Sequence, residues 1–170
     1  QVQDAVATEL QTVLEGKLPT AEAAPQLRLT TAVFKEAMRL YPPAYILTRE
    51  AIEPIEIAGY RVPKGANVIL SPYVMQRDAR WFEQPTLFCP DRFLSDELDE
   101  KQRRAFIPFG AGPRACIGMG FAMLEGVMVL ATLLSRCRLI REEPGEPDWK
   151  AEISLHPSDG LPLCVEPRGN

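Results

Sequence analysis

Histidine and closely spaced cysteines are almost missing from this sequence. Among the 170 residues, His156 is the single histidine, and no two of the four cysteines form a C-x-x-C pair. Because structural zinc sites need several such ligands at short spacing, we expect no zinc centre. The cysteine positions, 89, 116, 137 and 164, do not resemble a disulfide framework either. We therefore expect a reducing compartment and a cytoplasmic protein.

The sequence also lacks an excess of positive charge and an apolar run of membrane-spanning length. The formal net charge is −4 at pH 7, which argues against nucleic acid as the main partner. The longest apolar stretch, Met119–Leu134, is interrupted by Glu125 and is shorter than the roughly 20 residues that a membrane span requires. We expect it to be a buried core helix, with no membrane segment in this portion. The chain begins at Gln1 inside a helical pattern, so we expect residues upstream, which could carry an anchor.

Proline, by contrast, is abundant. The 16 prolines are nearly twice the usual share of about 5%, and they lie at turns rather than in a low-complexity tract. This pattern predicts many short elements joined by stiff loops. The hydrophobic share of 46% and the charged share of 25% are those of an ordinary globular protein.

Apolar periodicity predicts a fold that is mainly α with small β-sheets (α+β). Helices are expected over residues 1–15, 30–41, 71–79, 95–104 and 117–135. Thr30 is expected to cap the second helix, and Pro42–Pro43 to end it. Short strands are predicted over residues 45–49, 55–57, 60–62 and 68–70. The tail segments 153–155 and 161–165 are predicted to form a hairpin with each other.

The segment FKEAMRLYPP places Glu36 and Arg39 three residues apart on the second expected helix, where they are neighbours. Such a pair is usually solvated and contributes little. Positions 32, 33 and 40, about one turn away, are apolar, which favours a buried pair with further partners. Arg92, in the loop FCPDRF, is either one of those partners or an ordinary loop arginine. The residues alone leave both interpretations open.

The segment FGAGPRACIG, residues 109–118, places a cysteine between a tight turn and an apolar helix. Gly110 and Gly112 permit the positive φ angles of such a turn. Cys116 is expected in the first turn of the helix, where the dipole and the amides favour a thiolate. A thiolate there would be a good ligand for a soft metal centre. A core cysteine in a helix-capping loop is the alternative.

Residues around that cysteine suit a flat cofactor. Gly118, Gly120 and Ala122 are small and share the start of the helix, so a planar group could approach closely. Arg114 would place a guanidinium near the same site, where it suits a carboxylate on the cofactor.

Three of these segments resemble motifs of the cytochrome P450 superfamily. FGAGPRACIG matches the F-G-x-G-x-R-x-C-x-G haem loop in full, EAMR at 36–39 matches the E-x-x-R helix, and PDRF at 90–93 is similar to the P-E-R-F loop. They occur in the family's order and approximate spacing, and ISLHPSDGLPLCVEPR resembles its closing hairpin. The resemblance implies that residues 1–170 are the C-terminal, haem-binding portion of one larger cytochrome P450 domain. The distal N-terminal half would then lie outside this chain.

The resemblance also implies roles for the matching residues. Cys116 would be the proximal thiolate ligand of the haem iron and the catalytic centre. The implied cofactor contacts are Arg49 and Arg114 to the propionates, Phe109 over the sulfur, and Gly110, Ile117, Gly118 and Ala122. Glu36, Arg39 and Arg92 would form a buried triad that braces the haem loop. The substrate pocket would be lined by Ala44, Tyr45, Ile46 and Ile153.

The implied activity is a monooxygenase that uses haem b to insert one atom of O₂ into an apolar organic substrate. Electrons would come from NAD(P)H through a ferredoxin or a flavoprotein reductase. The basic run Lys101, Arg103 and Arg104 is then either a docking patch for that partner or a solvated face. The alternative function is a non-oxygenating haem-binding fragment or sensor, and a third is peroxide-driven oxygenation.

Two departures from the family pattern stand out. Asp91 replaces the usual glutamate, and Gln76 stands where many members carry histidine. Neither is expected to touch the iron chemistry. The larger departure is that nothing in residues 1–29 matches the family's distal helix. We therefore expect these 170 residues alone to be inactive.

Overall fold

The computed structural model describes residues 1–94, 98–143 and 145–169. Its helices are α1 (Val2–Leu14), α2 (Arg28–Leu40), α3 (Pro72–Met75), α4 (Glu100–Ala105) and α5 (Met119–Leu134). Its strands are β1 (Leu47–Glu50), β2 (Ile55–Ile57), β3 (Tyr60–Val62), β4 (Asn67–Leu70), β5 (Cys137–Arg141), β6 (Trp149–Ala151), β7 (Leu155–Pro157) and β8 (Leu163–Pro167). The expected fold class, mainly α with small sheets, is confirmed.

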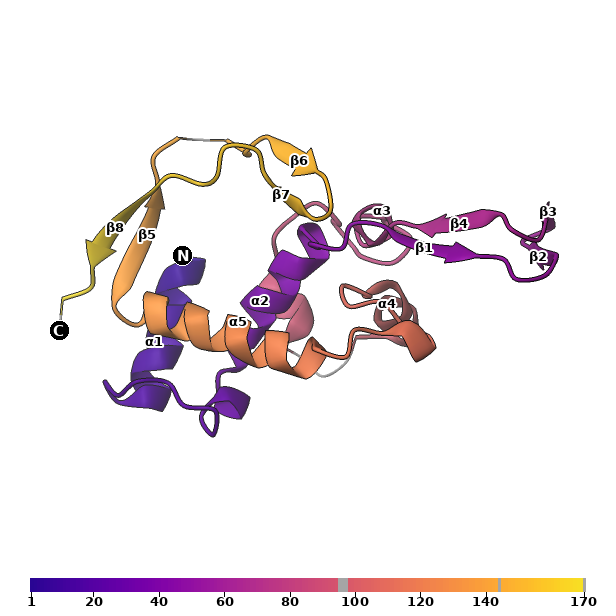
Figure 1. The fold of residues 1–170 in the computed structure, drawn as a ribbon. Coiled ribbons are helices and arrows are strands. Elements are labelled where there is room, and N and C mark those ends of the chain that lie inside the picture. The colour runs from indigo at the N-terminus through magenta and orange to yellow at the C-terminus, as the bar shows by residue number, and fades with distance from the viewer. Residues whose placement is uncertain (95–97, 144, 170) are drawn as a thin grey trace.

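The core forms where α1, α2 and α5 meet (Figure 1). Apolar residues at helical spacing supply it from each side, because only one stripe of each helix faces its neighbours. The fully buried members are Val6, Leu10 and Leu14 of α1, Val127, Ala131 and Leu134 of α5, and Leu27 just before α2. This cluster fixes α2, which carries Glu36 and Arg39, and α5, which follows the cysteine loop.

The start of α2 is capped by a side chain from α1, so the prediction that Thr30 caps this helix is wrong. Thr30 lies inside the first turn and is fully buried. The Glu9 carboxylate accepts from the amide of Leu29 at 2.6 Å and from the amide and hydroxyl of Thr30 at 2.9 and 2.7 Å. A carboxylate satisfies the unpaired N–H groups of a helix start whichever element supplies it. At the other end, α2 stops before Pro42, as predicted.

The apolar helix α5 is buried along one face only, so the prediction of a buried core helix is only partly correct. Val127, Ala131 and Leu134 are buried, whereas Phe121 is 71% exposed and Val129 52% exposed. The buried residues belong to the core that α5 shares with α1 and α2, whereas Phe121 and Val129 are outside that core. Among the helices of the described residues, none combines the length and the apolar character that a bilayer crossing requires.

Four two-stranded antiparallel ladders flank the helices in the described part of the chain. β1 pairs with β4 in an arm that points away from the helices, and β2 pairs with β3 at its far end (Figure 1). β6 and β7 form a hairpin near the end of α2, while β5 and β8 pair beside the start of α1. The predicted strands over residues 45–70 correspond to β1–β4, with boundaries correct to within about two residues.

The two tail strands do not pair with each other, so the predicted tail hairpin is wrong. β7 pairs with β6, and β8 pairs with β5 in the register Leu139↔Val165. Leu139 packs against the helical core, so this pairing extends the core in a way that a local hairpin would not. In the charged region predicted as a helix over 95–104, α4 begins at Glu100 after a capping box formed by Asp99 and Gln102. Residues 95–97 lie outside the described residues.

Candidate functional site

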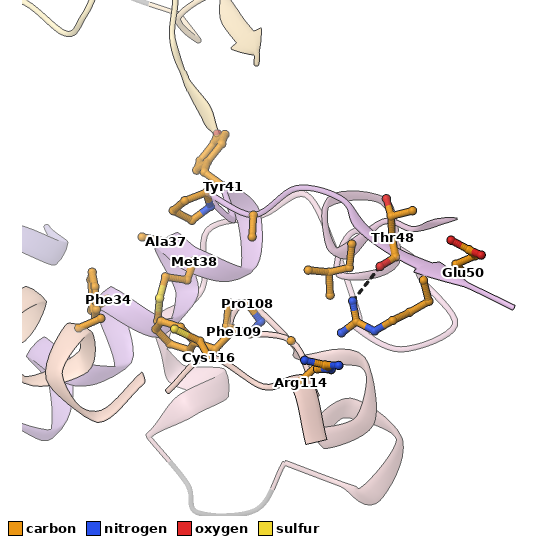
Figure 2. A pocket seen from close by; sticks show the side chains of 16 residues that line it. Phe34, Ala37, Met38, Tyr41, Thr48, Glu50, Pro108, Phe109, Arg114 and Cys116 are labelled. Atoms are coloured by element: carbon orange, nitrogen blue, oxygen red, sulfur yellow. Dashed lines mark hydrogen bonds between the residues drawn. The ribbon is translucent and has the colours of Figure 1, made fainter. Parts of the chain in front are cut away.

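A cavity of about 910 Å³ lies between the second half of α2, strand β1 and the cysteine loop (Figure 2). That volume is within the range of sites that hold small molecules and cofactors. Most of its wall is apolar, with a thiol and two guanidinium groups among the polar exceptions. The lining residues are Phe34, Ala37, Met38, Tyr41, Pro43, Ala44, Leu47, Thr48, Arg49, Glu50, Pro108, Phe109, Gly110, Arg114, Cys116 and Ala122.

The cysteine loop is closed by its own backbone. Gly110 and Gly112 have φ angles of 73° and 70°, the left-handed conformation that favours glycine. The amide of Cys116 donates to the carbonyl of Phe109 at 2.8 Å, which folds the loop back on itself. The prediction that Cys116 lies in the first turn of the helix is wrong, because α5 begins at Met119 with Gly118 as its N-cap. The loop, rather than the helix, therefore holds the exposed thiol at the cavity wall.

Two arginines reach the same cavity from different elements. Arg114 belongs to the short 3-10 turn Gly112–Arg114, and Arg49 belongs to β1. One guanidinium nitrogen of Arg49 donates to the carbonyl of Thr48 at 2.8 Å (Figure 2). A guanidinium has five N–H donors, so each arginine is suited to bind a carboxylate.

The donor set matches a haem rather than a bare metal ion. Within residues 1–94, 98–143 and 145–169, no group of three or more histidine, cysteine, aspartate or glutamate side chains is placed to hold a metal ion. The cavity instead offers Cys116 as one sulfur ligand and Arg49 and Arg114 for anionic groups. A haem is flat and apolar, carries two carboxylates, and accepts a cysteine thiolate as its axial ligand. The residues present fit that group.

Behind the cavity, Glu36 and Arg39 form a fully buried pair. Arg39 Nε donates to Glu36 Oε2 at 2.6 Å and Nη2 donates to Oε1 at 2.9 Å, a bidentate geometry. Arg92 Nε lies 3.5 Å from Glu36 Oε1, and the amide of Cys89 donates to the same oxygen at 2.8 Å. The structure thus brings Glu36, Arg39 and Arg92 together around one carboxylate. The Glu36–Arg39 pair is therefore buried rather than solvated, and Arg92 is one of its partners.

Arg39 also organises the backbone that follows α3. Its Nη1 donates to the carbonyls of Gln76 and Pro85 at 2.7 and 2.6 Å, and its Nη2 donates to that of Leu87 at 3.1 Å. These contacts satisfy a buried charge through several hydrogen bonds, which is what such a group requires. The network therefore fixes the irregular segment 76–89 against α2.

The predicted substrate-pocket residues are not all at the cavity. Ala44 lines it, whereas Tyr45, Ile46 and Ile153 are not among the lining residues. The hydroxyl of Tyr45 instead donates to the carbonyl of Glu152 at 2.9 Å. Ile153 is fully exposed in the turn between β6 and β7.

The β6–β7 hairpin is docked on the chain segment that follows α2. The ring of Tyr41, a cavity residue, stacks on Trp149 with centroids 4.4 Å apart. The amide of Leu155 donates to the carbonyl of Pro43 at 2.9 Å. Burial raises the pKa of the Tyr41 hydroxyl, and the neighbouring Glu146 carboxylate raises it further.

The remaining predicted residues do not line the cavity. Ile117 is fully exposed, and neither Ile117 nor Gly118 is among the residues that line the cavity. Arg103 and Arg104 lie in the last turn of α4, on which Lys101 is also exposed. Arg104 pairs with Glu100 on the same helix.

The α2 face of the cavity was not among the predicted site residues. Phe34, Ala37, Met38 and Tyr41 line it, and their spacing of three and four residues is that of one helix face. That periodicity was a usable signal. No comparable signal marked Gly126, where an added Cβ would overlap the ring of Phe34.

Comparison with known proteins gives a consistent assignment. A family model described as Cytochrome P450 matches residues 1–164. The chain is 42% identical over 167 residues to cyclooctatin synthase from Streptomyces melanosporofaciens, covering 96% of this chain and 36% of that protein. It is 42% identical over 134 residues to pentalenene oxygenase from Streptomyces avermitilis, covering 79% and 30% of the respective chains. It spans about a third of the length of these curated relatives.

A solved structure shares the fold. The structure described as the cytochrome P450DA heme domain superimposes with a TM-score of 0.87 at 27% sequence identity. The match covers 99% of this chain and 38% of that one.

Proposed function

The chain belongs to the cytochrome P450 family, and on that premise we propose that it forms the C-terminal, haem-binding part of a haem-thiolate monooxygenase. The proposed reaction inserts one atom of O₂ into an apolar organic substrate. The observation that carries this proposal is that the thiol of Cys116 and the guanidiniums of Arg49 and Arg114 line one apolar cavity.

Cys116 is the residue that would hold the haem iron, on a loop that the Phe109 carbonyl closes. When bound, the haem would supply an iron centre for dioxygen chemistry, to which the Cys116 thiolate would contribute electron density. Arg49 and Arg114 bind the cofactor's carboxylates, and Phe109 limits the access of water to the sulfur. The proposed cofactor is haem b, in keeping with the match to the cytochrome P450 family.

The buried network around Glu36 is the proposed support for the site. It ties the irregular segment 76–89 to α2, and α2 supplies one wall of the cavity. Glu36, Arg39 and Arg92 therefore act on the cofactor site through the backbone they hold rather than by touching the substrate. Their role is positional.

The proposed substrate is an apolar small molecule with few polar atoms. Two relatives carry names that describe such chemistry, pentalenene oxygenase and cyclooctat-9-en-7-ol 5-monooxygenase, the latter 37% identical over 168 residues. The largely apolar cavity wall, with Ala44 at the end that follows α2, supports the same class. Tyr45, Ile46 and Ile153 remain predicted pocket residues.

The proposed electron donor is a ferredoxin or a flavoprotein reductase that draws on NAD(P)H. Lys101, Arg103 and Arg104 are exposed on α4, where they suit an acidic partner surface. A cytoplasmic location stays a prediction from the cysteine pattern alone.

The ligand assignment is tested on the full-length protein with haem bound. Its reduced, carbon-monoxide-bound form should show the red-shifted Soret band of a thiolate complex, and Cys116→His should abolish that band. Cys164→Ser is the matched control, because Cys164 is also exposed but lies on β8 and is not a cavity residue. An unshifted band in the parent protein would refute the proposed function.

A further inference from the structure

Gln76 is fully buried, and its side-chain amide is engaged at both ends. Its Nε2 donates to the carbonyls of Met38 and Arg39 at 3.1 and 2.9 Å. Its Oε1 accepts from the amide of Ile107 at 2.9 Å. One side chain thus joins the end of α2 to the segment that leads into the cysteine loop.

The two α2 carbonyls that Gln76 binds are those that Pro42 and Pro43 leave unpaired. In a continuing helix, the amides of residues 42 and 43 would donate to the carbonyls of residues 38 and 39. Proline has no N–H group, so neither bond can form. The NH₂ group of Gln76 has two donors, one for each carbonyl, and buried carbonyls need such partners.

The third contact of Gln76 leads to the thiol. The amide of Ile107 donates to Gln76, and the carbonyl of Ile107 accepts from the amide of Gly110 at 3.0 Å. Two residues after Ile107, the Phe109 carbonyl accepts from the amide of Cys116 at 2.8 Å. The Gln76 anchor is therefore at the base of the turn that closes on Cys116.

We propose that Gln76 is a positioning residue for the Cys116 loop, through which the Pro42–Pro43 end of α2 is coupled to the sulfur. This inference rests on the proposed function for its consequence at the cofactor, but its structural content concerns the chain alone. Arg39 reinforces the arrangement, because its Nη1 donates to the Gln76 backbone carbonyl at 2.7 Å. Gln76 therefore binds the buried Arg39 through its backbone carbonyl and binds the segment leading into the loop through its side chain.

Three substitutions in the full-length protein separate this role from simple core packing. Gln76→Leu removes both the donors and the acceptor at nearly constant volume. Gln76→Asn keeps the amide but shortens it by one methylene, so that it cannot reach both sides. Gln76→His keeps one donor and one acceptor, enough for Ile107 and one α2 carbonyl, and is the conservative rescue.

Gln3 provides a matched control. Its side chain also bridges a backbone carbonyl and a backbone amide, donating to the Leu139 carbonyl at 2.7 Å and accepting from the Leu139 amide at 3.0 Å. That bridge joins α1 to β5, and neither residue lines the cavity. Gln3→Leu should therefore cost stability without disturbing the cysteine loop.

The first readout is amide hydrogen exchange over residues 106–116, measured with and without haem. Loss of the Ile107 anchor should speed exchange there roughly tenfold in Gln76→Leu and less in Gln76→Asn, while Gln76→His stays close to the parent. Gln3→Leu should leave this segment unchanged. The second readout is the fraction of thiolate-type Soret band in the reduced carbon-monoxide complex, which should fall in the same order.

Equal exchange over residues 106–116 in Gln76→Asn and Gln3→Leu, at matched melting temperature, would overturn the proposal. Gln76→Asn decides the question if Gln76→Leu does not accumulate as folded protein. If the parent itself lacked a thiolate band, the proposed function would fail, whereas the exchange arm would still decide the role of Gln76. The two inferences therefore fail in distinguishable ways.

Discussion

The ring of Phe34 on α2 occupies the space that a Cβ atom at position 126 of α5 would need. Glycine at 126 thus lets the two helices approach closely enough for Phe34 to fit between them. Phe34 also lines the cavity. The packing of α2 on α5 and the shape of the cavity therefore depend on the same contact.

Gly126→Ala should destabilise the protein by about 1–3 kcal/mol, the usual cost of overpacking a close contact. The cost should appear as a lower melting temperature and as altered haem retention, because Phe34 must move within the cavity wall. Phe34→Leu provides the test of mechanism, since a smaller side chain makes room for the added methyl group. A double variant as unstable as the sum of the two single variants would contradict this explanation.

Removing the Glu36 carboxylate should be far more damaging than removing an exposed one. Glu36→Ala leaves Arg39 charged and fully buried, which costs roughly 3–5 kcal/mol. Folded yield, melting temperature and haem content should all fall. Glu100→Ala, which breaks an exposed pair on α4, should cost less than about 1 kcal/mol. Equal effects of the two substitutions would show that the Glu36 network contributes no more than a surface pair.

Much of the fold follows from local pattern, because apolar spacing such as that of Val6, Leu10 and Leu14 specifies a helix face without knowledge of its neighbours. Contacts between distant segments have no such signature. Glu9 caps a helix that begins at Arg28, which no local cap residue indicates. β8 pairs with β5, whose Leu139 packs against the core. The sequence of the tail alone does not indicate that its partner strand is part of the core.

The candidate site likewise has a part that local sequence indicates and a part that depends on contacts between distant segments. The turn at Gly110 and Gly112 and the ligand role of Cys116 could be predicted, because all three residues lie in one short segment with a recognisable spacing. Gln76 stands out in the sequence only as a departure from a family pattern, and no local pattern indicates its three side-chain hydrogen bonds. The partners of Gln76 are 31 to 38 residues away, so only the folded chain brings them together.

Charge reversal on α4 should slow reduction by the electron donor. Lys101→Glu and Arg103→Glu replace attraction with repulsion toward an acidic partner, so the rate should fall at low ionic strength and recover at high ionic strength. Stopped-flow reduction at several salt concentrations measures this. Arg61→Glu, on β3 at the far end of the arm (Figure 1), is the matched control. A salt-independent rate in the parent and in the α4 variants would place the donor elsewhere.

The hydrogen bond between Tyr45 and Glu152 should control substrate binding without affecting the cysteine ligand. It links the segment after α2 to the turn that carries Ile153, and the Tyr41–Trp149 stack and the Leu155–Pro43 bond hold the same two segments together. Tyr45→Phe removes one bond, worth about 1 kcal/mol, so the hairpin should loosen while the fold persists.

For Tyr45→Phe we expect substrate affinity to fall by roughly fivefold, measured by titration of the haem spectrum with an apolar substrate. The Soret band of the carbon-monoxide complex should stay at the parent position, because neither the Tyr45–Glu152 bond nor the Leu155–Pro43 bond involves a residue of the Cys116 loop. Tyr60→Phe on β3, where the side chain is 78% exposed, controls for loss of a phenol as such. Unchanged affinity in Tyr45→Phe would mean that the remaining stack and backbone bond suffice to hold the hairpin. A shifted Soret band would instead show that the hairpin also affects the sulfur ligand.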